Sequence, residues 1–313
     1  MSGNPPSTTA LVTGGNAGLG LETVRAMVAG GRVSDVVVAS RDLARAEAAV
    51  HDIAGGEVRL HVAELDLASL ASVRTFPDRL DVLGLPPIGA LVCNAGVQIV
   101  DGTRYTEDGI EETFAVNVLG HFLLVKLLLG RLGHGARVIF ISSGTHDPSL
   151  KTGMPVPRYT NAAELAAGEG LAGLSGAKLG RARYTTSKLC SVYLAYELAK
   201  RYPLDNPAGP AVVASAMDPG LMAGSGLARN YGALSRLVWN HVLPVASRFI
   251  KGASTTTASG ADVARLATAE AFARESGVYY IGAEPSSSSV LSYDQFNAVD
   301  LWNTCATLSG VDP

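Results

Sequence analysis

The stretch Thr13-Gly14-Gly15-Asn16-Ala17-Gly18-Leu19-Gly20 decides the fold, because it joins an apolar run near Ala10–Thr13 to a helical pattern over Leu19–Ala29. Glycines let the backbone turn sharply and approach a ligand closely, and the free N–H groups of a helix N-terminus attract a phosphate. Structural turns also use glycine, but a strand before, a helix after and a place near the N-terminus are typical of a dinucleotide site. The residues predicted to bind a cofactor here are Gly14, Asn16, Ala17, Gly18, Leu19 and Gly20.

Short apolar runs rich in β-branched residues alternate with amphipathic stretches along the chain. The runs lack polar alternation, as strands buried on both faces do. We predict strands near Ala10–Thr13, Val36–Ala39, Val58–Val62, Ala90–Cys93, Val138–Ile141, Val212–Ala216 and Val278–Ile281. Helices are predicted over Leu19–Ala29, Asp42–Ala54, Ser69–Leu83, Glu107–Leu132, Tyr184–Arg201 and Ala261–Glu275. This alternation indicates an α/β fold: one Rossmann-type doubly wound sheet of about seven parallel strands with helices on both faces, in a single domain over residues 1–313.

The composition bounds the class of protein. The chain has 313 residues, is 47% hydrophobic and carries a formal net charge of −3, so it can build a large core, and its charge points to no nucleic-acid partner. Three separated cysteines favour a reducing cytoplasm, and scattered histidines indicate no metal site.

The start of the chain has no signal-peptide pattern, and the apolar stretch FLLVKLLLG (residues 122–130) is too short to span a bilayer. We expect a cytoplasmic protein with no integral membrane segment; a homo-oligomer is left open.

The end of the second predicted strand bears on the choice of cofactor. An acid there would bind the ribose 2′-hydroxyl of NAD, but this strand ends in Ala39-Ser40-Arg41. A hydroxyl and a guanidinium suit a 2′-phosphate, so NADP(H) is favoured over NAD(H). In the alternative interpretation, Arg41 is a solvated charge at the end of a strand, and the neighbouring Asp42 could equally neutralise it.

The third and fourth predicted strands end in polar or small residues. Asp66 and Leu67 follow the third strand, and Asp66 is placed to accept a hydrogen bond from the adenine amino group. Asn94, Ala95 and Gly96 follow the fourth and are expected to line the adenine–ribose side. Each of these alone is an ordinary turn signal.

A tyrosine stands four residues before a lysine in Arg183-Tyr184-Thr185-Thr186-Ser187-Lys188. On a helix the two side chains lie on one face, one turn apart. Because a nearby ammonium stabilises a phenolate, Lys188 could prepare Tyr184 for proton exchange near neutral pH. In the other interpretation the pair is a surface aromatic with a lysine lying beside it.

The ordered set of motifs resembles the short-chain dehydrogenase/reductase family over nearly the whole chain. The set is Thr13–Gly20 as the TGxxxGxG turn, Asn94-Ala95-Gly96, Asn117, Ser143, Tyr184 and Lys188 as YxxxK, and Pro219-Gly220. Within the family the chain looks most like the light-dependent protochlorophyllide reductases, on the long stretch between Ser143 and Tyr184, Lys188-Leu189-Cys190, Phe249-Ile250-Lys251-Gly252 and Gly277-Val278-Tyr279-Tyr280. Those reductases usually have a cysteine directly after the Pro-Gly pair, where this chain has Leu221.

The resemblance implies a role for each residue. The implied catalytic set is Asn117, Ser143, Tyr184 and Lys188. Tyr184 would give the proton to a carbonyl oxygen, Lys188 would tune it and hold the nicotinamide ribose, Ser143 would hydrogen-bond the substrate oxygen, and Asn117 would hold a water linked to Lys188. Beside the cofactor the resemblance further places Pro219, Gly220, Leu221 and Ser225.

Two long segments follow predicted strands and are expected to shape the substrate site. They are an insertion over residues 144–183 and a lid region over residues 221–260, and open α/β sheets bind ligands at this edge. The apolar residues of the second segment suggest a bulky apolar substrate or, equally, a helix pair packed on the sheet. His146 could reach the same cleft without being required there, and Cys190 is interpreted as packing.

Three functions are consistent with this pattern. The leading one is NADPH-dependent reduction of a ketone or aldehyde of a small molecule, or the reverse alcohol oxidation. The alternative is carbon–carbon double-bond reduction of the protochlorophyllide reductase type. The third is a non-catalytic NADP-sensing protein, which the presence of both Tyr184 and Lys188 disfavours.

Overall fold

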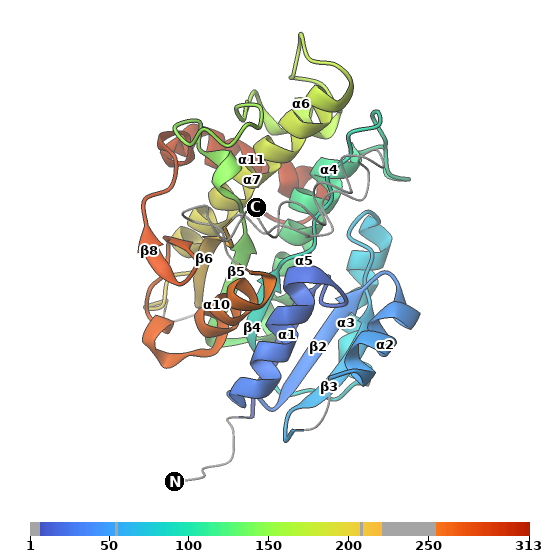
Figure 1. The fold of residues 1–313 in the computed structure, drawn as a ribbon, viewed down its shortest axis with the longest axis vertical. Coiled ribbons are helices and arrows are strands. Elements are labelled where there is room, and N and C mark those ends of the chain that lie inside the picture. The colour runs from blue at the N-terminus through green and yellow to red at the C-terminus, as the bar shows by residue number, and fades with distance from the viewer. Residues whose placement is uncertain (1–6, 54–55, 207–208, 221–254) are drawn as a thin grey trace.

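The fold is centred on one eight-stranded sheet, seen in a computed structural model that describes residues 7–53, 56–206, 209–220 and 255–313 (Figure 1). The strand order is β3-β2-β1-β4-β5-β6-β7-β8. Strands β1 to β7 pair in parallel, and β7 pairs with β8 antiparallel. The strands are β1 Thr9–Thr13, β2 Asp35–Ser40, β3 Arg59–Glu64, β4 Ile88–Cys93, β5 Leu132–Ile141, β6 Val212–Asp218, β7 Val278–Ile281 and β8 Glu284–Ser286. The predicted Rossmann-type sheet of seven parallel strands is confirmed.

Helices cover both faces of the sheet. One face carries α1 (Gly18–Gly30), α2 (Leu43–His51) and α10 (Thr256–Thr268), with α1 and α10 side by side in Figure 1. The other carries α3 (Leu70–Val82), α5 (Gly120–Leu128), α7 (Gly176–Arg201) and α11 (Gln295–Ser309). Every residue of β1, β2 and β6 is buried, which explains their unbroken apolar runs.

The strand β8 and the helix α11 were not predicted. A two-residue turn at Gly282 and Ala283 joins β7 to β8, with Gly282 in the left-handed region at φ 60°. Strand β8 has three exposed residues with Pro285 at its centre, so it carries little hydrophobic signal. Helix α11 begins at the cap Asp294, whose carboxylate accepts from the Asn297 N–H, and it packs on α7 and α5.

The helix predicted over Glu107–Leu132 is shorter than expected at both ends. Gly109 has a φ of 75°, and the Glu111 carboxylate accepts from the Phe114 N–H at 2.8 Å, so the helical run begins at α4 (Glu112–Phe114). It continues through a π-helical turn at Ala115–Leu119 into α5 and ends in a 3-10 turn at Leu129–Arg131. Leu132 already belongs to β5.

This run, Glu112–Arg131, has a mean hydropathy of 1.7 and 20 residues, so it is long and apolar enough to cross a membrane. The sequence-based judgement that the apolar stretch is too short was therefore wrong in length. However, 78% of its most apolar 18-residue window is buried inside the protein, between α3, α7 and α11. Its apolar character is accounted for by its place as a core helix.

The insertion over residues 144–183 is ordered structure on the carboxyl side of the sheet. It contains a 3-10 turn at Gly144–His146, the short helix α6 (Ala162–Ala166) and the first two turns of α7. The lid region predicted over residues 221–260 lies outside the described residues up to 254, and Thr256 already begins α10.

Candidate active site

The predicted site residues follow the carboxyl ends of neighbouring strands. The strand order runs outward in opposite directions from β1 and β4, which makes this pair the topological switch point of the sheet. The glycine-rich turn follows β1, Asn94-Ala95-Gly96 follows β4, Ser143 follows β5, and Pro219-Gly220 follows β6. The fold therefore brings these four segments together at the carboxyl ends of the parallel strands.

The glycine-rich turn leaves the start of α1 open to an anion. The N-cap residue Ala17 offers no side-chain hydrogen bond to the helix, so the first N–H groups of α1 are not capped by its side chain. Gly14 and Gly18 have φ of 65° and 54°, and a Cβ on Gly20 would meet the Gly14 carbonyl and lie 2.6 Å from Asn94 Nδ2. This arrangement fits a pyrophosphate against the helix N-terminus.

Asn94 and Thr13 hold the turn in this shape. The Asn94 side chain donates to the Thr13 carbonyl at 2.8 Å, and the Thr13 hydroxyl accepts from the Asn94 and Ala95 N–H groups. The hydroxyl also lies 2.9 Å from His121 Nε2. Asn94 thus holds the glycine-rich turn in place, and its predicted position on the adenine–ribose side of a cofactor remains a prediction. The contact of His121 with this turn was not predicted.

Arg41 is exposed and Ser40 is buried at the end of β2, the strand next to β1. The Asp42 carboxylate accepts from the Arg45 N–H at 3.0 Å as the cap of α2. Within the described ranges Arg41 has no ion pair, so the alternative of an Arg41–Asp42 pair is not what the structure shows. The Ser40 hydroxyl bonds to the main chain of Asp42.

Asp66 and Leu67 lie beyond β3, which ends at Glu64, at the edge of the sheet. The Asp66 carboxylate accepts from the Ala68 N–H at 2.9 Å, which is ordinary turn chemistry. Leu67 is buried. Their predicted contacts with adenine remain predictions.

Tyr184 and Lys188 lie one turn apart within α7, as predicted. Lys188 Nζ is 5.5 Å from the centre of the Tyr184 ring and donates to the Ile141 carbonyl at 2.8 Å. The Ser142 hydroxyl donates to the Lys188 carbonyl, also at 2.8 Å. Two hydrogen bonds therefore fix this part of α7 against the end of β5, where Ser143 follows. Both side chains are buried, which excludes the interpretation as a surface pair.

Asn117 lies in the π-helical turn, a distortion that is frequent at functional sites. Its Oδ1 accepts from the Val97 N–H at 2.8 Å, and its Nδ2 donates to the Val97 carbonyl and the Ser187 hydroxyl. A Cβ on Gly96 would lie 3.4 Å from this amide and 3.7 Å from Lys188 Nζ. Asn117 thus joins the segment after β4 to α7, and its holding of a water remains a prediction.

Ser143 starts the 3-10 turn, and His146 fixes its main chain. His146 Nδ1 lies 2.7 Å from the Ser143 carbonyl, and its Nε2 accepts from the Ser289 N–H at 3.1 Å. A carbonyl can only accept and an N–H can only donate, so the neutral ring with a proton on Nδ1 satisfies both bonds. Burial lowers the pKa of His146. His146 therefore ties the serine loop to the C-terminal part of the chain.

The serine run Ser286–Ser289 follows β7, and its last two residues are packed into the protein. Ser288 and Ser289 are buried, and the Ser288 hydroxyl bonds to Tyr196 and Ser292. Cys190 is fully buried, and burial raises the pKa of its thiol, in keeping with packing.

After β6, Ser259 donates to the Pro219 carbonyl at 2.6 Å, and the Gly220 N–H donates to Asp218. Asp218 was not predicted, although an acid directly before Pro-Gly at the end of an apolar strand was visible in the sequence. The predicted contacts Leu221 and Ser225 lie outside the described residues.

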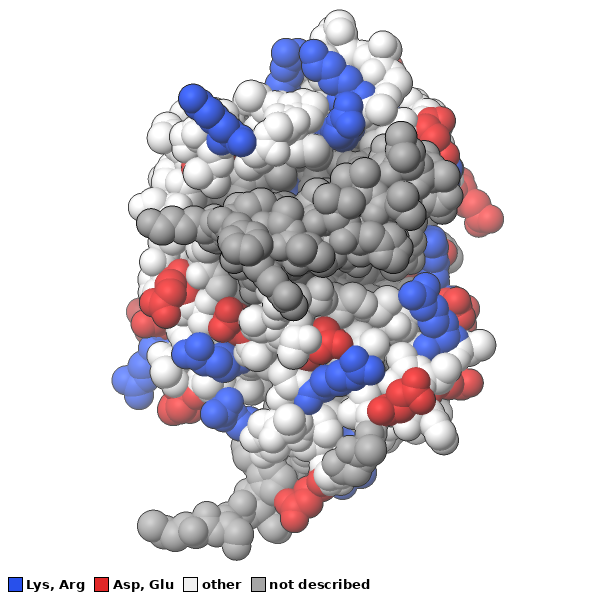
Figure 2. Space-filling view, in the orientation of Figure 1, with Lys and Arg blue, Asp and Glu red and all other residues white. Residues whose placement is uncertain are grey.

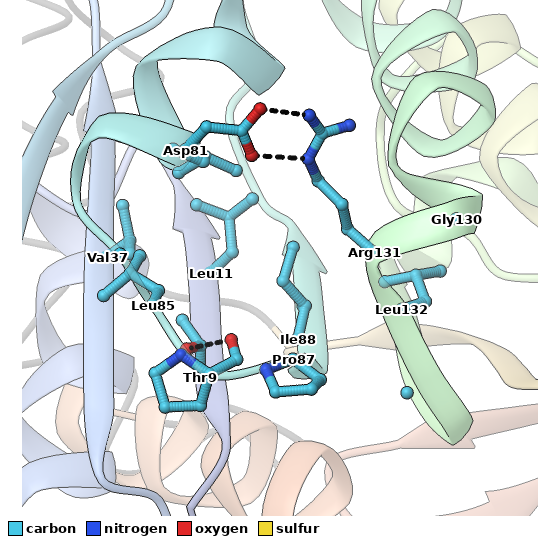
Figure 3. Close-up of a pocket in the computed structure, with 14 residues that line it drawn as sticks. Thr9, Leu11, Val37, Asp81, Leu85, Pro87, Ile88, Gly130, Arg131 and Leu132 are labelled. Carbon is cyan, nitrogen blue, oxygen red and sulfur yellow. Dashed lines mark hydrogen bonds and ion pairs between the residues drawn. The ribbon is translucent and has the colours of Figure 1, made fainter.

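A cavity of about 530 Å³ lies at the opposite edge of the sheet (Figure 3). Its lining includes Thr9, Ile88 and Leu132, which begin β1, β4 and β5. Arg131 and Asp81, which both line it, form an ion pair with an Nη2–Oδ2 distance of 2.6 Å. None of the predicted site residues in the described part of the chain lines it.

The fold and the carboxyl edge define a dinucleotide-type site with a buried tyrosine–lysine pair. The family model described as "short chain dehydrogenase" matches residues 8–155. The chain is 33% identical to polyprenol dehydrogenase of Danio rerio, covering 96% of this chain and 86% of that protein. It is 32% identical to protochlorophyllide reductase of Avena sativa, covering 89% and 90%. The chain belongs to the short-chain dehydrogenase family of oxidoreductases.

Solved structures agree on the fold. A crystal structure of an uncharacterised Mycobacterium paratuberculosis protein superposes with a TM-score of 0.70 and 27% identity, covering 98% of this chain and 96% of that one. A blue fluorescent protein from a metagenomic library, crystallised in complex with NADPH, gives a TM-score of 0.62 at 22% identity, covering 90% and 99%.

Proposed function

We propose that this oxidoreductase uses NADPH to reduce the ketone or aldehyde of a bulky apolar small molecule, or oxidises the corresponding alcohol, with Tyr184 as the proton donor. The observation that carries the proposal is the buried Tyr184–Lys188 pair, fixed to the end of β5 by the Lys188–Ile141 bond. A positive charge this close to the ring favours the phenolate, so the hydroxyl can release its proton to a substrate oxygen.

The residues present fit a dinucleotide. The uncapped start of α1 suits the pyrophosphate, and the close packing at Gly20 would exclude any side chain from that cradle. The exposed Arg41 favours a 2′-phosphate, and hence NADPH. When bound, the cofactor supplies or accepts the hydride.

The protein would position the substrate and move the proton. The Ser143 hydroxyl follows β5 and would donate to the substrate oxygen, stabilising its developing charge. Lys188 would hold the ribose hydroxyls of the cofactor next to Tyr184. Asn117 would keep Gly96 and Ser187 in place around that lysine, through the bonds to Val97 and Ser187.

The relatives support a large apolar substrate. Polyprenol and protochlorophyllide, named in the relatives' descriptions, are both bulky and largely apolar. The likeness to protochlorophyllide reductases supports a second candidate, reduction of a carbon–carbon double bond, whereas Leu221 in place of their usual cysteine argues against that pigment. We also propose a cytoplasmic location, since all three cysteines are buried and free.

One set of incubations separates the candidates. Purified protein would be mixed with NADPH and a panel of apolar ketones and aldehydes, with NADP⁺ and polyprenols, and with NADPH and protochlorophyllide in light and in darkness. Cofactor turnover with a carbonyl or a polyprenol supports the proposal. Pigment reduction that needs light would replace it by the second candidate, and NADPH binding without turnover of any class would favour a sensing role.

A further inference from the structure

Asp218 is buried between the two loops that frame the candidate active site. It ends β6, and 8% of the residue is exposed. Its Oδ1 accepts from the Gly220 N–H at 2.9 Å, and the Gly144 N–H also donates to the carboxylate. A Cβ on Gly144 would lie 2.9 Å from Oδ2, so the carboxylate lies directly against that backbone. Asp218 therefore joins the main chain of Gly144, after β5, to that of Gly220, after β6.

The carboxylate also balances the buried ammonium of Lys188, of which 6% is exposed. Burial lowers the pKa of Lys188 to about 8, and the negative charge of Asp218 opposes that fall. Burial raises the pKa of Asp218. The hydrogen bond from the Gly220 N–H and the electrostatic interactions with His146 and Lys188 oppose that rise. Each side chain thus stabilises the charged form of the other, and removing one leaves an uncompensated buried charge.

Other titratable groups also face this pair. They come from four elements: His121 from α5, His146 and Asp147 from the loop after β5, Tyr184 from α7, and Tyr279 from β7. Asp218 is the acidic group whose charge acts on Lys188, whereas Asp147 acts on His146 and Tyr279. This difference makes Asp147 a matched control.

We propose that Asp218 is a positioning residue of this site: its carboxylate holds the main chains of Gly144 and Gly220 together and compensates the buried positive charge of Lys188. Asp218 acts through these groups and not on the substrate. The inference rests on the proposed function, in which the Lys188 ammonium serves the cofactor and Tyr184.

The first test uses the protein without cofactor. A lysine whose pKa is lowered on folding releases its proton earlier in the folded state, so stability rises with pH from about 8 to 10.5. Asp218→Asn should move the start of this rise down by roughly half to one pH unit. The urea-midpoint difference between wild type and Asp218→Asn should therefore narrow between about pH 6.5 and 8.5. The urea-midpoint difference between wild type and Asp147→Asn should stay constant over the same pH range.

The second test is NADPH affinity against pH, followed by cofactor fluorescence. Wild type and Asp218→Asn should bind similarly at pH 6.5, and the variant should be roughly two- to fivefold weaker at pH 8, because a larger share of its Lys188 has lost its charge. If wild type binds no NADPH at any pH, the proposed function fails, while the unfolding comparison still decides the role of Asp218. If Asp218→Asn matches wild type in both pH profiles, the inference is overturned.

Lys188→Gln provides the same test if Asp218→Asn does not fold. Without the ammonium, the raised pKa of the buried carboxylate rises further, and stability is lost as pH increases through it. Lys188→Gln should therefore lose urea stability relative to wild type as the pH rises from the ordinary carboxyl range toward neutrality, and a stability difference that does not change with pH would contradict the pairing.

Discussion

Lys188 donates to the carbonyl of Ile141 at 2.8 Å, which fixes the ammonium 5.5 Å from the centre of the Tyr184 ring. The bond runs from a helix to the last residue of a strand, so the position of the charge is set by the sheet and not by the lysine alone. The phenol, the ammonium and Ser143 after β5 thereby share one frame. Their chemistry can be tested residue by residue.

Tyr184→Phe removes the proposed proton donor while keeping the ring. We expect turnover to fall by roughly 10²- to 10⁴-fold, the usual contribution of general acid catalysis, with NADPH affinity nearly unchanged. Tyr202→Phe, at the far end of α7, makes the same deletion where the hydroxyl accepts a bond from Lys126, and should leave the rate unaltered. Steady-state rates of both variants with a carbonyl substrate measure this difference. Full activity in Tyr184→Phe would mean that another group donates the proton.

Arg41→Ala tests the preference for NADPH. The guanidinium is exposed at the end of β2 and would bind the 2′-phosphate by a charge-assisted bond, so its loss should weaken NADPH binding by roughly ten- to a hundredfold and leave NADH binding unchanged. Arg45→Ala removes an equally exposed charge from the first turn of α2 and serves as the control. If Arg41→Ala weakened the binding of NADPH and NADH equally, Arg41 would not be the residue that binds the 2′-phosphate. The same conclusion would follow if Arg45→Ala weakened NADPH binding as much as Arg41→Ala.

Gly20→Ala tests the cradle at the start of α1. The added methyl would lie 2.6 Å from Asn94 Nδ2 and against the Gly14 carbonyl, so the turn must shift and NADPH binding should fall at least tenfold. Gly30→Ala, in the same helix, has its nearest neighbour at 3.9 Å and should be neutral or stabilise the fold by about 0.4–1 kcal/mol. Calorimetric titration with NADPH and urea unfolding measure both effects, and tight binding by Gly20→Ala would contradict the proposed cradle.

His121→Gln tests the acid sensitivity of the folded state. Burial lowers the pKa of His121 from 6.5 to about 4, so the unfolded chain binds the extra proton first and stability is lost as pH falls from 6.5 to 4. The loss would be roughly 3 kcal/mol from this residue, and His121→Gln should show a smaller decline in urea stability over that range. His51→Gln, at a side chain that is 91% exposed, should decline like wild type. If the urea stability of wild type, His121→Gln and His51→Gln declined equally as the pH falls, the decline would not come from His121.

The sequence predicts the parts of this molecule whose signals are local. The turn at Thr13–Gly20 and the spacing of Tyr184 and Lys188 each lie within eight residues, and buried parallel strands give continuous apolar runs. Asn117 was predicted without its partners, because its bonds to Val97 and Ser187 bridge 20 and 70 residues. The partnership of Asp218 with Gly144 and Lys188 exists only once β5, β6 and α7 have come together.

The distribution of charge over the folded protein is likewise not predictable from the sequence. The net charge of −3 does not reveal that acidic and basic side chains are interspersed over the lower half of the face in Figure 2. The burial of Lys188 and Asp218 likewise cannot be inferred from composition. Helix α11 went unpredicted for a related reason: its apolar residues cover α5 and α7, and this role appears only in the folded arrangement.

Trp302→Ala tests whether α11 is an integral part of the core. The Trp302 ring is 2% exposed, meets Phe122 edge-on at 4.9 Å and lies under the Arg201 guanidinium. Removing it should cost about 3–5 kcal/mol, whereas Phe296→Ala, on the same helix at 90% exposure, should change stability by no more than about 0.5 kcal/mol. Urea unfolding measures both. Equal stability of the two variants would mean that α11 contributes little to the core.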